Sequence, residues 1–421
     1  MITWRREPIA LAPSIEEDKD GVWSGSAVVD DEGRLVVFYT GHRWRNGVDD
    51  AEGNLQVQCM AVSTDGVTFE KKGPVIEGPP ELQHFRDPKV WRQDGGWYMV
   101  FGASSAEGRG EVWLYTSTDL RTWQFDRVLY RDPDPNVFMV ECPDLIPFGD
   151  RWVIAYGPMT QAKQHGYALR NGHNGGYVVG RWAPGGDFEV LTDYRPLDWG
   201  HHYYATQGFE APDGRRLMIG WMGGFVLPLA SQAEDGWSGQ LAVPREVRLS
   251  DDNRLISIPI REVEALRTET ADFGSFVLGV NEDRVLWDDA ETADIELEVD
   301  LAATTAEQVG VQVHRTSESR CTYVAYDDLA GRVSLDRRTT GPGDRGYRSA
   351  PFGGGDRLRL RILVDRGSVE VFVGDGDESV SSLSFPADGP RGIALSSVSG
   401  TVAVTSLRVH RLKTIWDRPD R

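Results

Sequence analysis

Apolar strands separated by polar turns recur along the first 225 residues of the chain. Each repeat has a leading segment, a turn rich in glycine and aspartate, and an apolar strand that ends in glycine. The closing glycines lie 61, 55 and 63 residues apart, at Gly41, Gly102, Gly157 and Gly220. Four short strands with their turns need about 55–60 residues, so this period predicts the blades of a β-propeller. A chance series of hairpins in another all-β protein is the alternative.

The leading segments of the repeats are predicted to hold a functional site. In a propeller the first strand of each blade lines the central axis, so residues on these strands converge at one end of the channel. The segments contain Trp23 with Ser24, Arg86 with Asp87, Glu141 with Cys142, and Tyr204 with Gln207.

The start of the chain resembles the end of a blade. Trp4 followed by Glu7-Pro8-Ile9 parallels Phe69 followed by Gly73-Pro74-Val75. Within the later repeats, the distance from the axial segment to the corresponding aromatic residue is 36 to 46 residues. We therefore expect a five-bladed propeller whose first blade is largely missing from this sequence.

The second half of the chain predicts a β-sandwich. Arg359–Val364 and Val369–Val373 flank a tight turn at 365–367, which is a hairpin signal, and short alternating strands continue over about 140 residues. A short helical stretch at Arg261–Arg267 precedes them. The predicted division is a propeller over 1–255, a linker over 256–268 and a sandwich over 269–421. Support of the propeller is the expected role of the sandwich, and ancillary sugar binding is the alternative.

Composition removes several classes of partner. The 421 residues carry 65 acidic and 45 basic side chains, a net charge of -20, which argues against nucleic acid and anionic membranes. No apolar run is long enough for a membrane span, and the first residues lack a signal-peptide core. Three distant cysteines (Cys59, Cys142, Cys321) form no disulfide framework, so we expect a reducing cytoplasm. Without HExxH or CxxC, no metal site is predicted.

Two axial acids are the candidate catalytic groups. Asp87 and Glu141 lie 54 residues apart, which makes them equivalent positions in the repeat. Each precedes a proline within two residues, Pro88 or Pro143, which ends regular pairing and fixes the carboxylate at the strand end. Convergent carboxylates in an aromatic-lined cleft carry out glycoside hydrolysis. Glu141, between apolar neighbours, suits the acid, and Asp87, beside Arg86, suits an ionised acceptor of sugar hydroxyls. Two surface acids at turn edges are the alternative.

In these segments the sequence resembles glycoside hydrolase family 32, the β-fructosidases, and most closely its bacterial sucrose-6-phosphate hydrolase and invertase branch. The matching segments, in chain order, are Trp23-Ser24-Gly25-Ser26, Phe85-Arg86-Asp87-Pro88, Glu141-Cys142-Pro143-Asp144, Tyr204-Ala205-Thr206-Gln207, Gly220-Trp221-Met222, Gly236-Trp237, Pro244-Arg245-Glu246 and Val364-Asp365-Arg366-Gly367-Ser368-Val369-Glu370-Val371-Phe372. The resemblance therefore runs almost from end to end.

The resemblance implies a five-bladed propeller with a C-terminal sandwich that hydrolyses β-fructofuranosides with retention and needs no metal or organic cofactor. It implies that Asp87 holds fructose hydroxyls and stabilises the transition state, and that Glu141 is the acid/base. The residues that it places around the fructose are Trp23, Ser24, Arg86, Cys142, Tyr204 and Gln207. Sucrose, sucrose 6-phosphate and short fructans are the candidate substrates.

Two departures from the family pattern affect these expectations. The family nucleophile is an aspartate in a WMNDPNG-type segment, and the sequence contains no such segment. His202 stands where the family usually has aspartate, which leaves the preferred leaving group open. We therefore expect poor sucrose hydrolysis by this polypeptide.

Three interpretations of the missing nucleophile remain. One is a late-assigned start codon or a truncated gene of an active hydrolase. Another is a non-catalytic fructoside-binding relative. The third is replacement by another residue, such as Asp49 or Asp50. An inverting propeller glycosidase that acts on arabinosides is a separate alternative.

Overall fold

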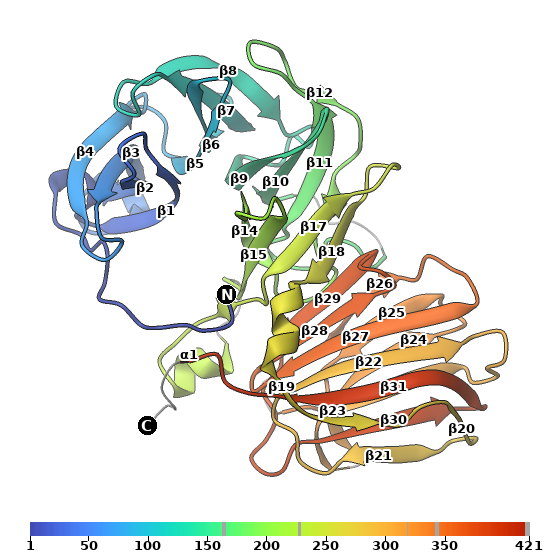
Figure 1. Ribbon diagram of the computed structural model, residues 1–421. Coiled ribbons are helices and arrows are strands. Elements are labelled where there is room, and N and C mark those ends of the chain that lie inside the picture. The colour runs from blue at the N-terminus through green and yellow to red at the C-terminus, as the bar shows by residue number, and fades with distance from the viewer. Residues whose placement is uncertain (162–165, 226–228, 318, 342–344, 417–421) are drawn as a thin grey trace.

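The computed structural model describes residues 1–161, 166–225, 229–317, 319–341 and 345–416, and their strands form six sheets. Four small sheets follow one another along an arc, and two larger sheets form a separate layered body beside it (Figure 1). The predicted all-β class, with propeller-type sheets followed by a sandwich, is confirmed. None of the helices within these residues is long and apolar enough to cross a membrane.

Each of the four small sheets is an antiparallel meander. The first contains β1 (Gly21–Val29), β2 (Leu35–Trp44), β3 (Asn54–Ser63) and β4 (Glu70–Glu77). The second contains β5 (Phe85–Gln93), β6 (Gly96–Ser104), β7 (Gly110–Ser117) and β8 (Gln124–Arg131). The third contains β9 (Met139–Phe148), β10 (Arg151–Met159) and β11 (Gly176–Arg181), with β12 (Glu189–Val190) and β13 (Arg195–Pro196) beside β11. The fourth contains β14 (Tyr204–Glu210), β15 (Arg216–Met222), β17 (Arg245–Leu249) and β18 (Leu255–Pro259), with β16 (Gln240–Leu241) beside β15.

Apolar side chains fill the spaces between successive sheets, which explains why the inner strands read as continuous hydrophobic runs. Each such strand is covered on both faces, so neither face needs polar residues. Three of the buried clusters each combine side chains from neighbouring sheets: examples are Phe38 with Phe101, Val100 with Ile154, and Val153 with Met218. The first strand of each sheet packs against that of the next, β1 against β5, β5 against β9 and β9 against β14. Among the described residues, no strand of the first sheet pairs with the fourth.

The N-terminal segment, whose sequence resembles the end of a blade, makes one parallel bridge between Trp4 and Trp416. The backbone N–H of Trp4 donates to the Ile415 carbonyl at 2.7 Å. The short helix η1 (Glu16–Asp18) then leads to β1, and the wholly buried Asp18 accepts a hydrogen bond from the Tyr39 hydroxyl.

The C-terminal body is a two-layer sandwich around one large apolar core. One sheet contains β19 (Arg267–Asp272), β20 (Phe276–Leu278), β22 (Ala293–Asp300), β27 (Arg357–Asp365), β28 (Ser368–Val373), β29 (Glu378–Leu383) and β31 (Val402–Leu412). The other contains β21 (Asp283–Trp287), β23 (Gln308–Ser317), β24 (Arg320–Asp327), β25 (Arg332–Asp336), β26 (Tyr347–Pro351) and β30 (Gly392–Val398). The hairpin expected around 365–367 is the β27–β28 pair.

The remaining helices of the described residues are short: η2 (Asp50–Glu52), α1 (Ala230–Glu234) and η3 (Arg261–Leu266). Of these, η3 joins the two bodies. The predicted linker over 256–268 holds the end of β18, all of η3 and the start of β19.

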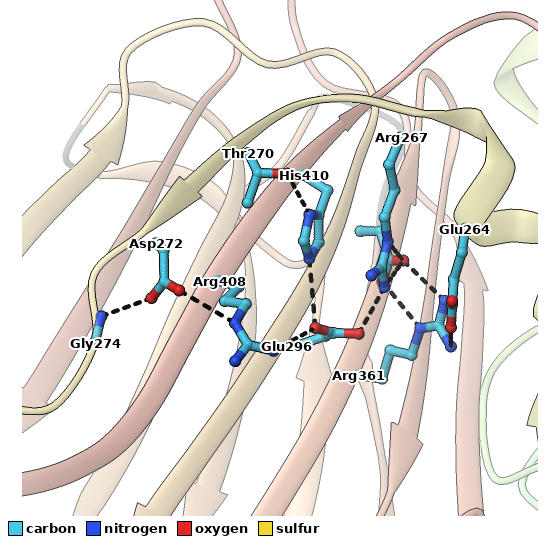
Figure 2. Close-up of polar contacts among 10 residues, drawn as sticks. Glu264, Arg267, Thr270, Asp272, Gly274, Glu296, Arg361, Arg408 and His410 are labelled. Carbon is cyan, nitrogen blue, oxygen red and sulfur yellow. Dashed lines mark hydrogen bonds and ion pairs between the residues drawn. The ribbon is translucent and has the colours of Figure 1, made fainter.

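A network of charged side chains ties four strands of the first sandwich sheet together (Figure 2). Asp294 is wholly buried and accepts hydrogen bonds from Arg267 at 2.6 Å and from Arg361 at 2.8 Å. Glu296 accepts a further bond from Arg267 and lies 3.4 Å from Nε2 of His410. The network therefore connects β19, β22, β27 and β31.

Arg245 fastens the fourth small sheet to the sandwich. Its side chain is wholly buried, and Nη2 lies 3.1 Å from Asp198 and 2.9 Å from Glu370. The guanidinium also lies 3.7 Å from the centre of the Tyr203 ring. One side chain therefore links strand β17 to β28 and holds the segment that leads into β14.

Candidate active site

The innermost strand of every small sheet carries one extra residue at the same end. The antiparallel register shifts at Ser24, between Arg86 and Lys89, between Glu141 and Asp144, and between Tyr204 and Gln207. At three of these bulges a non-glycine residue has a positive φ, 70° at Asp87, 46° at Cys142 and 50° at Ala205. Bulges re-aim side chains, and strained backbone of this kind concentrates at functional sites.

The bulges correct one expectation about the repeat. They align Asp87 with Cys142 and Arg86 with Glu141, so the two candidate acids are not equivalent positions. Asp87 and Glu141 lie 54 residues apart, whereas the second and third sheets are offset by 55 residues at their closing glycines. The predicted equivalence of the two acids was therefore wrong by one residue.

The two carboxylates nevertheless meet around one guanidinium. Arg86 Nη2 donates to Glu141 Oε1 at 2.8 Å, and Arg86 Nε lies 3.9 Å from Asp87 Oδ2. The backbone N–H of Cys142 donates to the same Asp87 oxygen at 2.9 Å. Asp87, Arg86, Glu141 and Cys142 therefore form one connected cluster between the second and third sheets.

Asp87 is the more enclosed member of the pair. Its side chain is 6% exposed, and its backbone N–H donates to Thr40 Oγ1 at 2.9 Å. Burial raises the pKa of Asp87, the Arg86 charge opposes this, and the Glu141 charge adds to it. The ionised state that the sequence suggested for Asp87 therefore depends on Arg86.

Glu141 is more accessible and is held from two sides. Its side chain is 17% exposed, and its second oxygen accepts a hydrogen bond of 2.6 Å from the Tyr204 hydroxyl. Burial raises the pKa of Tyr204 well above its ordinary value, so this hydroxyl remains a donor. Arg86 and Tyr204 together fix both oxygens of the carboxylate, one from the second sheet and one from the fourth.

Trp23 provides an aromatic surface beside the cluster. Its ring stacks on His42 at 3.9 Å between centroids, with 13° between the planes, and its side chain stays 37% exposed. The Arg86 guanidinium lies 6.0 Å from the centre of the Trp23 ring. Ser24 is exposed at the bulge, and its carbonyl accepts a hydrogen bond from Thr40. An exposed indole beside polar groups is suited to the apolar face of a sugar.

Cys142 and Gln207 are placed differently from what their motifs suggest. The Cys142 thiol is buried, and burial raises its pKa well above the ordinary value, so this residue reaches the cluster through its backbone N–H. Gln207 is half-buried beyond the fourth bulge and pairs with Ile219. Within the described part of the chain, no hydrogen bond joins Gln207 to the Arg86 cluster.

Sequence reasoning missed two histidines behind the cluster. Burial lowers the pKa of both His42 and His84 to about 4, so both are neutral near pH 7. Gln56 lies 3.3 Å from the Nδ1 atom of His42, and Arg86 lies 3.0 Å from that of His84. His42 directly follows Gly41, so reading one residue beyond each closing glycine would have found it.

A row of aromatic rings continues from Tyr204, away from the Arg86 cluster's carboxylates. The His173 ring lies 5.7 Å from Tyr204 and 5.0 Å from Phe225, which in turn lies 5.0 Å from Trp221. Phe225 is 65% exposed. His173 and Phe225 come from loops with no recognisable motif, so the sequence held no signal for them.

A buried ion pair lies next to the cluster on the axial strands. Lys89 lies 3.0 Å from Asp144, which is wholly buried, and both side chains bond the backbone of Gly208. Two neighbouring carboxylates of unequal exposure, such as Asp87 and Glu141, can protonate a glycosidic oxygen and stabilise positive charge on a sugar ring.

Similarity to known proteins extends over nearly the whole chain. Residues 1–259 match the Glycosyl hydrolases family 32 N-terminal domain, and residues 262–411 match the Glycosyl hydrolases family 32 C terminal. The chain is 39% identical to sucrose-6-phosphate hydrolase of Escherichia coli over 96% of its length and 82% of the relative. It is 38% identical to raffinose invertase of Escherichia coli over 96% of its length and 83% of that protein.

Solved structures give the same result for the fold. A Bombyx mori GH32 β-fructofuranosidase superposes with a TM-score of 0.84 and 30% identity, over 99% of this chain and 83% of that one. A mutant of that enzyme was solved in complex with sucrose. The sucrose-6-phosphate hydrolase of Lactobacillus gasseri superposes with a TM-score of 0.83 over 96% of this chain and 81% of that one, at 23% identity, which is a likeness of fold.

Proposed function

The chain belongs to glycosyl hydrolase family 32, and on that premise we propose that its Arg86 cluster binds β-fructofuranosides and supplies the acid/base and the fructose-binding carboxylate of a retaining hydrolase. The observation that carries the proposal is the pair Asp87 and Glu141, held by one guanidinium but exposed to different degrees. Sucrose, its 6-phosphate and short fructans are the substrates that we propose. The cytoplasmic location expected from the unpaired cysteines stays a prediction.

Glu141 acts as the acid/base in this proposal. It is the more accessible carboxylate, so it can reach the bridging oxygen of a bound fructoside and donate a proton as the bond breaks. Tyr204 and Arg86 fix its two oxygens in place, which limits the reorganisation that proton transfer requires. In the second half of a retaining reaction the same carboxylate would take a proton from the water that displaces the nucleophile from the sugar, so this half requires that nucleophile.

Asp87 binds the fructose ring and stabilises the transition state. The Cys142 N–H and the Thr40 hydroxyl hold this residue from both sides, so its carboxylate is fixed before the sugar arrives. A carboxylate that accepts sugar hydroxyls strengthens those bonds as the ring gains positive charge. The exposed Trp23 face covers the apolar side of the sugar.

A retaining mechanism also needs a nucleophile. The carboxylates that the described residues bring to this cluster are Asp87 and Glu141, and both already have other roles. The test therefore has to read binding and turnover separately.

Isothermal titration of the purified protein with sucrose, together with an assay of released fructose, makes that separation. Asp87→Asn should weaken sucrose binding about tenfold, because a hydrogen bond to a charged group is worth ~1.5–3 kcal/mol. Glu141→Gln should keep the affinity and lower any fructose release by about 10²-fold or more. Glu189→Gln, on the exposed strand β12, is the matched control and should change neither.

The outcomes distinguish the candidates. Absence of sucrose binding to the intact protein, or unchanged affinity in Asp87→Asn, would overturn the proposal. Sucrose binding without fructose release by the parent protein would instead support a non-catalytic fructoside-binding relative. Release of the opposite anomer, followed by NMR, would identify an inverting glycosidase.

A further inference from the structure

The Arg86 guanidinium serves the two carboxylates with only part of its donors. Nη2 donates to Glu141 and Nε lies near Asp87, which leaves the other terminal nitrogen, Nη1. Nη1 donates to the side-chain oxygen of Gln56 at 3.3 Å and to Nδ1 of His84 at 3.0 Å. The Arg86 side chain is 5% exposed, so little water reaches these donors. Two side chains that the proposed mechanism does not use therefore hold the second half of the guanidinium.

The contact with Arg86 fixes the tautomer of His84. A guanidinium has donors and no acceptor, so Nδ1 of His84 has to accept, and the proton of the neutral ring lies on Nε2. Burial lowers the pKa of His84 to about 4, the Arg86 charge lowers it further, and the Glu141 charge raises it. The ring also packs 5.1 Å from that of Phe138. His84 is therefore a neutral acceptor near pH 7.

The hydrogen bonds of Gln56 fix the orientation of its amide group. The oxygen accepts from the Phe85 N–H at 2.9 Å as well as from Arg86, so the nitrogen faces Nδ1 of His42 at 3.3 Å. His42 is neutral near pH 7, so it accepts this bond. The His42 ring in turn stacks on the indole of Trp23. Gln56 thus connects the guanidinium to the aromatic surface beside it.

Uncharged acceptors suit a guanidinium that has to hold two carboxylates. A third carboxylate on Nη1 would draw the guanidinium toward itself and share its charge, which would weaken its hold on Glu141 and Asp87. With no acceptor, a buried N–H of Arg86 would stay unpaired, and the side chain could turn away. The ionised state of Asp87 depends on the Arg86 charge, because burial alone raises its pKa. An amide and a neutral imidazole fix the direction of the guanidinium and leave its charge to the carboxylates.

We propose that His84 and Gln56 are positioning residues, which aim Arg86 at Glu141 and Asp87, and that His84 does so only while it is uncharged. The inference rests on the proposed function of the two carboxylates and deepens it. It assigns a role to two residues that act only through Arg86.

Protonation of His84 should release Arg86. A proton on Nδ1 turns the acceptor into a donor that faces another donor, with two positive groups 3.0 Å apart. Among the described residues, the charged groups that act on His84 are Arg86, two positions along the chain, and Glu141 of β9. Because the pKa of His84 is lowered to about 4, the arrangement should persist at neutral pH and fail as the pH falls through about 4. A histidine with its ordinary pKa would release Arg86 already near about pH 6.5.

Two substitutions of His84 separate its acceptor from its ring. His84→Phe keeps a ring against Phe138 and removes the acceptor, whereas His84→Gln keeps a neutral acceptor and removes the ring. In calorimetry with sucrose at pH 7, His84→Phe should bind about fivefold more weakly, and His84→Gln should recover most of that loss. Gln56→Glu places a charge on Nη1 and should weaken binding at least as much. His410→Phe, the same exchange in the sandwich, is the matched control and should change nothing.

Nitrogen-15 NMR of the eight histidines gives a measurement that needs no sugar. His84 should be the neutral Nε2–H tautomer at pH 7. Arg86→Gln should raise the pKa of His84 toward its ordinary value, because the Arg86 charge lowers it. A charged His84 at pH 7, or an Nδ1–H tautomer, would overturn the inference whatever the protein binds.

The outcomes separate this inference from the proposed function. If the parent protein binds no sucrose, the proposed function fails, and the histidine spectra decide whether His84 holds Arg86. If sucrose binds, equal affinity of the parent and a folded His84→Phe would refute the positioning role. Weaker binding by His84→Gln than by His84→Phe would show that the ring acts by packing alone and would also refute it. If His84→Phe does not fold, Gln56→Glu decides, and an unchanged affinity there would count against the inference.

Discussion

Replacing Arg245 with methionine should cost more stability than any other single change in the contact between propeller and sandwich. The side chain is wholly buried and donates to Asp198, Glu370, Ser379 and Ser381. Methionine keeps most of the volume but removes every donor. Asp198 would keep the N–H groups of Gly200 and Ser381 as donors, whereas Glu370 would keep the N–H of Val243.

The size of the expected loss in stability is set by the carboxylate charge that stays buried when Arg245 is removed. Removing one partner of a buried ion pair costs about 3–5 kcal/mol, because the other charge stays buried without compensation. At about 2 °C per kcal/mol, the melting temperature should fall by about 6–10 °C. Arg248→Met, at an exposed position of the same strand β17, is the control and should change it by less than about 1 °C.

The loss of stability in Arg245→Met should increase with pH because of Glu370. Burial raises the pKa of Glu370, and Arg245 lowers it. Without Arg245 the folded state holds a proton on Glu370 more tightly than the unfolded state. Such a group favours the folded state below its unfolded pKa, and this advantage is lost as the pH rises through the folded pKa. The difference between Arg245→Met and the parent should therefore be larger at pH 8 than at pH 5.

Differential scanning calorimetry at the two pH values measures both effects. Because Arg245 joins the two bodies, we also expect the variant to unfold in two resolved steps where the parent shows stronger coupling. A fall of less than about 2 °C, or an equal fall at both pH values, would refute the reasoning that Glu370 is left with an uncompensated charge.

Three further predictions follow from single contacts. Tyr204→Phe removes one of two hydrogen-bond donors to Glu141. Fructose release should fall about tenfold, because a charge-assisted hydrogen bond is worth ~1.5 kcal/mol. An unchanged rate of release would contradict the role of Tyr204 in positioning Glu141. Phe225→Ala removes an exposed ring beside Tyr204 and should weaken sucrose binding about fivefold, because an aromatic contact is worth ~1 kcal/mol. Fructose binding should stay the same if Phe225 contacts the leaving group of the substrate. Equal losses of affinity for both ligands in calorimetry would argue against that contact. Asp294→Ala leaves Arg267 and Arg361 without their buried carboxylate, so the free energy of unfolding in urea should fall by about 3 kcal/mol. Glu298→Gln, which removes the carboxylate of a partly exposed ion pair with Arg357, should lower it by less than about 0.5 kcal/mol.

The period of the chain was enough to predict the blades and the axial strands, because each small sheet repeats the same order of turn and apolar strand. The spacing of the two acids nevertheless misaligned Asp87 and Glu141 by one residue. Register in a sheet is set by hydrogen bonding across the bulge, and an offset of one residue there leaves the apolar pattern of the strands unchanged.

The residues of the candidate site fall into two groups, those that the repeat marks and those that it does not. Trp23, Arg86 and Tyr204 lie in axial segments and could be predicted because they recur at one position of the repeat. His173 and Phe225 come from loops, whose path depends on the sheets that flank them, so no local pattern marks them. The role of Cys142 lies in its backbone N–H, which any non-proline residue could supply, so its side chain could not reveal it.

The bulges explain how an arc of separate sheets forms one site. Each contact in the cluster joins a sheet to its successor: Thr40 of the first to Asp87 of the second, Asp87 to Cys142 of the third, and Glu141 to Tyr204 of the fourth. In two of these contacts a backbone N–H at the bulge is the donor, which the extra residue turns out of the regular ladder. The geometry around Arg86 is therefore built from neighbour to neighbour. A substitution that weakens the packing between the second and third sheets should loosen Asp87 and Glu141 together, whereas one in the sandwich core should reach them only through the contacts between sandwich and propeller, such as that of Arg245.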